Sequence, residues 1–497
     1  MKTRVILFAV TAALAAVLIV APAVHLAREP HPARYDRLAP IADLEPADAA
    51  VAQKLRDLLA FGAERLLQSS RDRASVAVFY HMRGFAPLWV EGGAPNPRAL
   101  AAQDYLAAVS AEGLDPNDYA PLDAPAGRDA AALAADLAAA ELRFTATILQ
   151  YARDAQNGRV PFTSVSADVD YPRSVTKARD ILTVIAQSAD VATTLGEFNP
   201  PHEGYRALRR KLAQLRAGGP DGATSSASRS MLNQVDIVVA NLERWRWLPR
   251  DLGNDHVVVN IPDYALDLMH NGTPLFRTKV VVGAPDLPTP LLSAAMTSIT
   301  VNPIWNIPAS LIENEYLPAL VRDPGLAERM GLKIERGSSG KVRIYQPPGD
   351  DNVLGRIRFN FPNRFQVYQH DTNERSLFAE PAPDSSHGCI RVEKPFAYAA
   401  ALLAIAAPED GYSEDRLRSL IGDREVVVPL AKPIPVHLTY QTAFVDAQGD
   451  LVFRDDIYAL DSRTLAALHA PRVKTGRDGG TTLSATQDIA QSKFVSP

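Results

Sequence analysis

The chain has 497 residues, of which 47% are hydrophobic, and its formal net charge at pH 7 is −5. This length predicts two or three domains, and the hydrophobic content is typical of a globular protein with a sizeable core. The acidic balance argues against a nucleic-acid-binding protein, which would carry a basic surface. It also argues against attraction to an anionic polymer by bulk charge, so binding to such a partner must be local.

Residues 1–27 predict an export signal. Two basic residues stand near the start, an almost unbroken apolar run extends from Val5 to Val20, and the small residues at 21–23 offer a cleavage site. An uncleaved anchor is the alternative, because the apolar run continues through residues 5–24 and approaches the ~20 residues that span a bilayer. We therefore expect export, with either cleavage or anchoring in the inner membrane.

The segment after the signal is predicted to be mainly helical. Residues 28–48 are rich in proline, alanine and charge and are expected to form a linker. In residues 49–216, leucine and valine recur at helical spacing, and the alanine-rich stretch 130–140 favours helix. The Gly, Ser and Ala content of residues 217–230 predicts a flexible linker.

A cluster of four aromatic residues and one leucine lies within the helical part, and it has two interpretations. It could be a platform on which sugars stack, or it could be core packing at a helix end. Gly84 and Pro87 interrupt it, as expected near a helix end, so we favour the core interpretation. Its members are Phe79, Tyr80, Phe85, Leu88 and Trp89.

After Gly253 the pattern becomes strand-like. Residues 231–248 are expected to form the helix that leads into this part. Asn271-Gly272 lies between two strand-like runs and is a strong signal for a tight hairpin. Strands are predicted at Val257–Ile261, Tyr264–Met269, Lys279–Val282, Ile299–Val301 and Phe365–Tyr368.

The sheet is interrupted by residues 308–355, which carry a helical stretch and a glycine-rich turn at 337–340. A long insertion of this kind is usually functional, and its position predicts a lid. Residues 395–422 predict a helix pair, and residues 431–470 a C-terminal extension with further strands. The polar composition of residues 471–497 predicts a disordered tail.

The chain contains one cysteine, Cys389, within the run SSHGCIRV at 385–392. A lone cysteine is often a small buried hydrophobic residue. Here its neighbours are polar, and a histidine or an arginine nearby can help to form the thiolate that acts as a nucleophile. We therefore interpret Cys389 as a catalytic nucleophile.

The run SSHGCIRV resembles the signature of the L,D-transpeptidases, cysteine enzymes that crosslink peptidoglycan. The agreement extends upstream. VYQHDT at 367–372 resembles the family's strand that ends in a histidine, and PPGDDNVLGRIRFNFPN at 347–363 resembles the segment before it. VNPIWNIP at 301–308 resembles the start of the family's active-site flap. The resemblance is closest to the large periplasmic subgroup with a helical scaffold.

This resemblance implies an α+β multidomain protein. A helical N-terminal scaffold would precede a mostly-β catalytic domain at 231–430, which carries the inserted lid and is followed by the C-terminal extension. The protein would act in the periplasm or cell envelope on peptidoglycan stem peptides, without cofactor or metal, and carbapenems would acylate its cysteine. Many relatives also carry a separate helical peptidoglycan-binding module, for which this sequence leaves no room.

Acyl transfer assigns roles to the residues around the cysteine. Cys389 would attack a peptide carbonyl, and His370 would be the general base. His387 is the alternative base. A histidine that ends a strand can face the cysteine from a separate wall, however, and the family's base is the upstream histidine. Asp371 adjoins His370 but faces the other way in a strand, so we expect a backbone carbonyl to orient the imidazole.

The remaining predicted site residues stabilise charge or hold substrate. Gly388 permits the sharp turn that presents the cysteine, and the backbone N–H groups of Gly388 and Cys389 are candidate oxyanion donors. Arg391 would orient a substrate carboxylate or else stiffen the loop by an ion pair. Substrate contacts are expected from Ser386, Trp305 and Tyr345.

Other functions stay open at this point. A zinc site could use the cysteine and a histidine, but the sequence lacks the further ligand motifs that tetrahedral sites require. A wall-binding scaffold without catalysis is the non-enzyme alternative. Within the family, the sequence leaves the acceptor undecided among a stem amine, which gives a 3→3 link, a D-amino acid, a protein and water.

Overall fold

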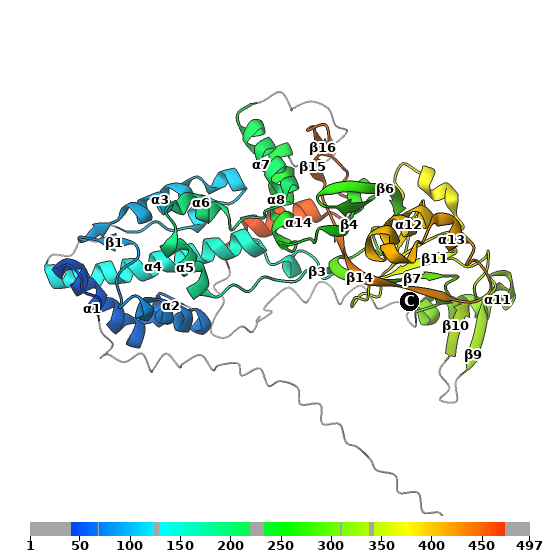
Figure 1. Ribbon diagram of the computed structural model, residues 1–497, viewed down its shortest axis with the longest axis horizontal. Helices are drawn as coiled ribbons and strands as arrows, with labels where there is room; N and C mark the ends of the chain where they lie inside the picture. The colour runs from blue at the N-terminus through cyan, green and yellow to red at the C-terminus, as the bar shows by residue number, and fades with distance from the viewer. Residues whose placement is uncertain are drawn as a thin grey trace, which may run out of the picture.

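The computed structural model describes residues 41–67, 69–123, 129–218, 233–308, 311–336 and 342–472. The predicted export signal at 1–27 lies outside these ranges, as do the turn at 337–340, most of the linker at 217–230 and the tail beyond residue 472. No helix in the described ranges is long and apolar enough to cross a membrane. A helical half and a β-rich half lie side by side (Figure 1), which confirms the predicted fold class.

The helical half is built around one long helix, α4 (Ala130–Asn157). The alanine-rich sequence favours this helix, and the Asp129 side chain caps its start by accepting from Ala132 N at 2.8 Å. The predicted aromatic cluster is buried against α4, which confirms the core interpretation. The surrounding helices are α1 (Pro46–Phe61), α2 (Ser70–Met82), α3 (Pro97–Ala107), α5 (Ala178–Gln187) and α6 (Val191–Gly196).

The β-rich half is a nine-stranded sheet in the order β11-β12-β13-β6-β5-β4-β14-β7-β3. Strand β11 also pairs with β7, so eight of the strands close into a ring and only β3 stays outside it. The strands are β3 (Val169–Asp170), β4 (Asp255–Asn260), β5 (Ala265–His270), β6 (Thr273–Val281), β7 (Leu291–Val301), β11 (Ile357–Asn360), β12 (Gln369–His370), β13 (Ile390–Val392) and β14 (Val426–Thr439).

Several predicted elements are found in this sheet. Asn271 and Gly272 both have positive φ and join β5 to β6 in the predicted tight hairpin. The strand expected at Phe365–Tyr368 is wrong, because the strand begins only at Gln369. The Asn363 side chain accepts from Phe365 N and Val367 N and holds the preceding residues in a turn instead.

Two features cross the expected domain limits. Strand β14 runs past residue 430 and pairs with both β4 and β7, so residues 431–439 are part of the sheet. Strand β3 comes from the helical half and pairs with β7. The two halves therefore share a sheet.

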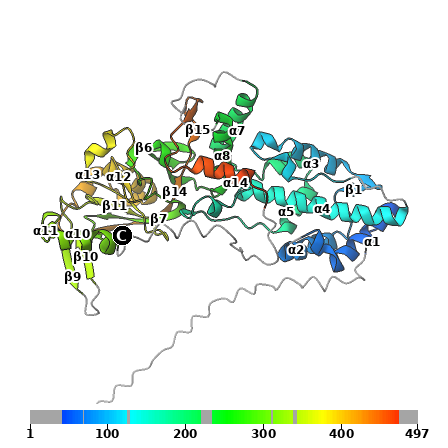
Figure 2. The same ribbon diagram turned by 180° about the vertical axis from the view of Figure 1, so that it is seen from behind.

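Helices complete the β-rich half and join it to the rest. Helix α12 (Pro395–Ala406) is followed by the short α13 (Glu414–Arg418). Helix α7 (Glu203–Arg216), helix α8 (Gln234–Trp247) and the hairpin β15–β16 (Ala443–Val445, Leu451–Phe453) form a cluster between the halves. The final helix, α14 (Leu460–His469), packs on α8, where Arg244 and Asp461 form a buried ion pair at 2.5 Å. Figure 2 shows α14 between the two halves from behind.

The predicted insertion forms a small subdomain with its own core. It contains the π-helix η7 (Ile312–Tyr316), α10 (Leu317–Arg322), α11 (Leu326–Arg329) and a sheet in the order β8-β10-β9. The strands are β8 (Trp305–Asn306), β9 (Lys333–Arg336) and β10 (Val342–Gln346). This subdomain lies at the end of the molecule away from the helical half (Figures 1 and 2).

Candidate active site

Strand pairing brings three of the predicted site residues, His370, Cys389 and Arg391, onto one face of the closed sheet. Strands β12 and β13 run parallel, with His370 opposite Arg391, and β11 places Arg358 opposite His370 on the other side. Because side chains alternate between the faces of a strand, Cys389, just before β13, lies on the same face as Arg391. The opposite face packs in the core, where Tyr398 of α12 donates to Gln369 at 2.9 Å.

Tyr368 belongs to the cysteine face, although the sequence reasoning did not single it out. Its carbonyl accepts from Ile390 N at 3.0 Å, which aligns β12 with β13 beside Cys389. Its hydroxyl interacts with the Cys389 thiol and with Trp305. Its ring packs against that of His370, with centroids 5.7 Å apart. The sequence carried a signal, because Tyr368 precedes His370 by two residues, the spacing at which side chains next to a strand share a face.

His370 is buried, with 5% of its surface exposed. Its Nδ1 lies 2.5 Å from the backbone carbonyl of Asp371. A carbonyl can only accept, so Nδ1 carries the proton and Nε2 is the basic nitrogen. The Asp371 side chain instead accepts from Arg356 N at 2.8 Å and pairs with Arg375. A backbone carbonyl thus orients the imidazole, as we predicted.

The acid–base pair is neutral at rest. Burial, together with the charges of Arg391 and Arg358, lowers the pKa of His370 to about 3. Burial raises the pKa of the Cys389 thiol to about 11, against the opposing effects of Tyr368 and the two arginines. At neutral pH the imidazole is therefore unprotonated and the thiol keeps its proton. The sheet face therefore holds a thiol and a neutral base rather than a preformed thiolate–imidazolium pair.

The turn before Cys389 requires a glycine. Gly388 has φ of +97°, in the left-handed region, and a Cβ there would lie 3.3 Å from the Pro288 carbonyl oxygen. Its carbonyl accepts from the Thr289 hydroxyl at 2.9 Å, and that hydroxyl accepts from Gly283 N at 2.8 Å. Tyr458 supports the same loop by donating to the Gly283 carbonyl at 2.7 Å and accepting from Thr289 N at 3.1 Å.

This arrangement fixes the direction of a candidate oxyanion donor. The Gly388 carbonyl and the Cys389 N–H belong to one planar peptide and point in opposite directions. By holding the carbonyl, Thr289 therefore aims the Cys389 N–H. The Gly388 N–H, in contrast, donates to the Ser386 hydroxyl at 3.2 Å. Thr289 and Tyr458 were missed because they are far from Cys389 in sequence and carry no local motif.

The other predicted residues next to the cysteine make contacts within the protein. Ser386 is 2% exposed and its hydroxyl donates to the Cys389 carbonyl at 2.6 Å, a contact that organises the loop. His387 is exposed, and its Nε2 lies 3.7 Å from Glu315 on η7 of the inserted subdomain. Arg391 pairs with Glu374, the stiffening contact that we considered as its alternative role.

The inserted subdomain brings only one of its two predicted residues to the site. Trp305 is buried in the subdomain core, to which Tyr368 also packs. Tyr345 pairs with Asn306, one position along from Trp305, and so lies on the other face of the small sheet. There its hydroxyl donates to Glu335 at 2.9 Å and its ring stacks on Arg343. The described residues hold no group of three His, Cys, Asp or Glu side chains arranged for a metal ion.

Fold and site define a protein with a cysteine and a neutral histidine on one face of a closed β-sheet. Residues 254–426 match the family model of the L,D-transpeptidase catalytic domain, and residues 74–212 match that of a scaffold domain. The chain therefore carries an L,D-transpeptidase catalytic domain, and a scaffold domain precedes it.

One curated relative and two solved structures illustrate the similarity. A Haemophilus influenzae protein described as "Putative L,D-transpeptidase" is 31% identical over 260 residues, which cover 49% of this chain and 52% of that protein. The chain thus matches about half the length of this relative. An L,D-transpeptidase from Mycobacterium smegmatis is 14% identical, covering 37% of this chain and 58% of that chain, with a TM-score of 0.21. L,D-transpeptidase 3 from Mycobacterium tuberculosis with a faropenem-derived adduct is 13% identical, covering 37% and 60%, with a TM-score of 0.20.

Proposed function

We propose that this protein is a peptidoglycan L,D-transpeptidase that forms 3→3 crosslinks between stem peptides through a thioester on Cys389. The observation that supports the proposal is the shared sheet face, which carries a neutral histidine on β12 and a protonated cysteine just before β13. Acyl transfer requires a nucleophile, a base and an oriented oxyanion donor. Cys389, His370 and the peptide held by Thr289 supply the three.

The reaction follows from these groups. The Cys389 sulfur attacks the carbonyl of the third residue of a tetrapeptide stem, while Nε2 of His370 takes the thiol proton. The tetrahedral oxyanion faces the Cys389 N–H. Its collapse breaks the peptide bond, and the terminal D-alanine leaves as an amine with the proton from His370. The side-chain amine of a second stem then attacks the thioester, and His370 takes the amine proton. As the new C–N bond forms, the C–S bond breaks, and His370 returns the proton to the leaving sulfur to restore the thiol.

Supporting contacts come from the inserted subdomain, which we propose acts as a lid. Its Trp305 contacts Tyr368, whose hydroxyl interacts with the Cys389 thiol, and its Glu315 lies 3.7 Å from His387, two residues before the cysteine. A closed lid would exclude water and favour an amine acceptor over hydrolysis. We place the protein in the periplasm, in line with the export signal predicted at residues 1–27, and expect carbapenems to acylate the same thiol.

Intact-protein mass spectrometry tests the acyl-enzyme. After incubation with a tetrapeptide donor or a carbapenem, the wild-type protein should gain one acyl group and Cys389→Ser none. His370→Ala should slow acylation by ~10²–10⁴. His387→Ala is the matched control, because this exposed side chain faces the inserted subdomain, and its rate should stay within a few fold of wild type.

Three results would contradict the assignment. An unmodified wild-type protein would reject the acyl-enzyme, and an equally modified Cys389→Ser would reject the nucleophile. If His387→Ala were slowed as much as His370→Ala, with both variants keeping the wild-type circular dichroism spectrum, the base would have to be reassigned. Mass spectrometry of the products from defined muropeptides then identifies the acceptor as a stem amine, a D-amino acid or water.

A further inference from the structure

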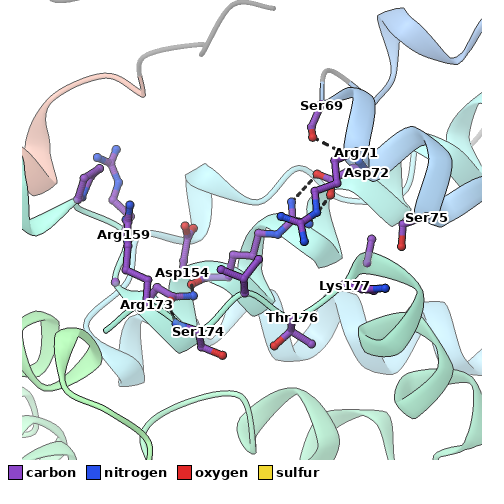
Figure 3. Close-up of a pocket in the computed structure, with 16 residues that line it drawn as sticks. Ser69, Arg71, Asp72, Ser75, Asp154, Arg159, Arg173, Ser174, Thr176 and Lys177 are labelled. Carbon is purple, nitrogen blue, oxygen red and sulfur yellow. Dashed lines mark hydrogen bonds and ion pairs between the residues drawn. The ribbon is translucent and has the colours of Figure 1, made fainter. Parts of the chain in front are cut away.

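The helical half contains a polar cavity of about 470 Å³, far in the sequence from the cysteine. It is lined by the start of α2, the end of α4, the loop that follows α4 and the segment that leads into α5. Figure 3 shows these side chains gathered around the hollow. Its volume lies within the ~300–1,000 Å³ of ligand pockets.

The acidic residues of this cavity are already neutralised. Asp72 accepts from Arg153 through two contacts of 2.5 Å each. Asp154 accepts from Arg472 and, at 2.9 Å, from the Tyr119 hydroxyl. These contacts form the floor of the cavity and pair both of the carboxylates that line it.

The rim, in contrast, carries two arginines whose charge no described residue neutralises. Arg71 and Arg173 are both exposed, and neither forms an ion pair with any residue that the structure describes. The Arg173 guanidinium lies 5.5 Å from the Phe162 ring centroid, so an aromatic side chain positions it. Hydroxyl groups stand between the cations, from Ser69, Ser174 and Thr176.

These groups match an anionic ligand that also offers hydroxyl or amide groups. Arginine guanidinium groups bind carboxylate or phosphate oxygens by charge-assisted hydrogen bonds, and hydroxyls complement sugar or peptide groups. The formal net charge of −5 gives the protein no general attraction to an anionic polymer. An anionic ligand would therefore be attracted to the local positive charge of this rim rather than to the protein surface as a whole.

We propose that this cavity is a second binding site, separate from the cysteine face, which holds a carboxylate-bearing peptidoglycan fragment. The identity of the ligand rests on the proposed function, whereas its anionic chemistry follows from the cavity itself. The site would give the protein a contact with the sacculus outside the cysteine face. A neighbouring part of the polymer would be held while the cysteine acts on a stem.

The test compares two charge-matched variants in the full chain with Cys389→Ser, which prevents turnover. Arg71→Glu/Arg173→Glu reverses both rim charges. Arg143→Glu/Arg206→Glu makes the same change on exposed arginines that do not line the cavity. Binding to purified sacculi is measured by cosedimentation, and binding to a soluble disaccharide tetrapeptide by calorimetry, with inorganic phosphate as competitor.

The rim variant should bind both probes about tenfold more weakly than the control, and added salt should narrow the difference. Equal binding by the two variants would overturn the site. Displacement of the disaccharide tetrapeptide by millimolar phosphate would overturn the carboxylate assignment in favour of a phosphate ligand.

A parallel measurement separates this proposal from the proposed function. With Cys389 present, the rim variant should acylate as fast as wild type with a soluble tetrapeptide, because the cavity does not touch the cysteine face. A wild-type protein that gains no adduct would reject the transpeptidase assignment and leave the binding result intact. A rim variant that acylates tenfold more slowly would overturn the separation of the two sites.

Discussion

Thr289→Val is the sharpest test of how the cysteine loop is held. Valine keeps the shape of threonine but removes the hydroxyl that joins Gly283 N to the Gly388 carbonyl. Thr289 is 1% exposed, so water cannot replace the lost contacts. A buried polar group left without a partner costs ~1–3 kcal/mol, so two such groups predict a loss of roughly 2–6 kcal/mol of unfolding free energy.

The catalytic effect has a separate origin. Once the Gly388 carbonyl is released, its peptide can rotate and the Cys389 N–H no longer points at the developing oxyanion. Loss of one oxyanion donor lowers the rate of acyl transfer by ~10²–10³-fold. Partial misorientation of the Cys389 N–H should lower the acylation rate by at least ~10-fold and by no more than the loss of the donor would. Binding of the donor should change little, because Thr289 is buried and offers no surface to a substrate.

Mass spectrometry measures the rate of acylation, and thermal unfolding measures stability. Thr289→Ser retains the hydroxyl and should restore most of the acylation rate. Tyr458→Phe leaves the Thr289 side chain in place and removes only the support of the loop backbone, so its effect should be intermediate. If folded Thr289→Val acylates as fast as Thr289→Ser, the hydroxyl does not aim the oxyanion donor.

Two further predictions concern the thiol and the lid. Because burial raises the pKa of Cys389 to about 11, its alkylation by iodoacetamide should rise about tenfold per pH unit from 7 to 10. A free thiol compound of pKa about 8.5 levels off above that pH, and a plateau for the protein near neutral pH would contradict the neutral resting pair. Replacing residues 309–350 with a short linker should raise the ratio of hydrolysis to transpeptidation, and an unchanged ratio would argue against water exclusion.

Local sequence chemistry predicted the parts of the fold that depend on neighbours in the chain. Asn271 and Gly272 both tolerate positive φ, so the hairpin between β5 and β6 could be predicted from two residues. The alanine-rich run predicted the long helix α4, because alanine has the highest helix propensity of the residues. Strand β3 has only two residues, too few for a periodic pattern, so its pairing across the two halves had no signal.

The site shows the same division. The run around Cys389 carries its chemistry within a few residues, and its glycine and histidine could be assigned from their types. Tyr368 could have been predicted, because side chains alternate between the two faces of a strand and Tyr368 is two residues before His370. Thr289 and Tyr458 could not, because their contacts with the loop join residues 99 and 175 positions apart. Such contacts exist only once the sheet has closed.

The segment after β14 connects the two candidate sites physically. At one end, Tyr458 holds the loop that fixes the Gly388 carbonyl through Thr289. At the other end, Arg472 pairs with Asp154 in the floor of the cavity between α2 and α5. Helix α14 lies between these ends and is fixed to α8 by the buried pair of Arg244 and Asp461. Tyr458→Phe should therefore affect only the cysteine loop, and Arg472→Ala should affect only the cavity floor. Removal of the whole segment should destabilise both sites.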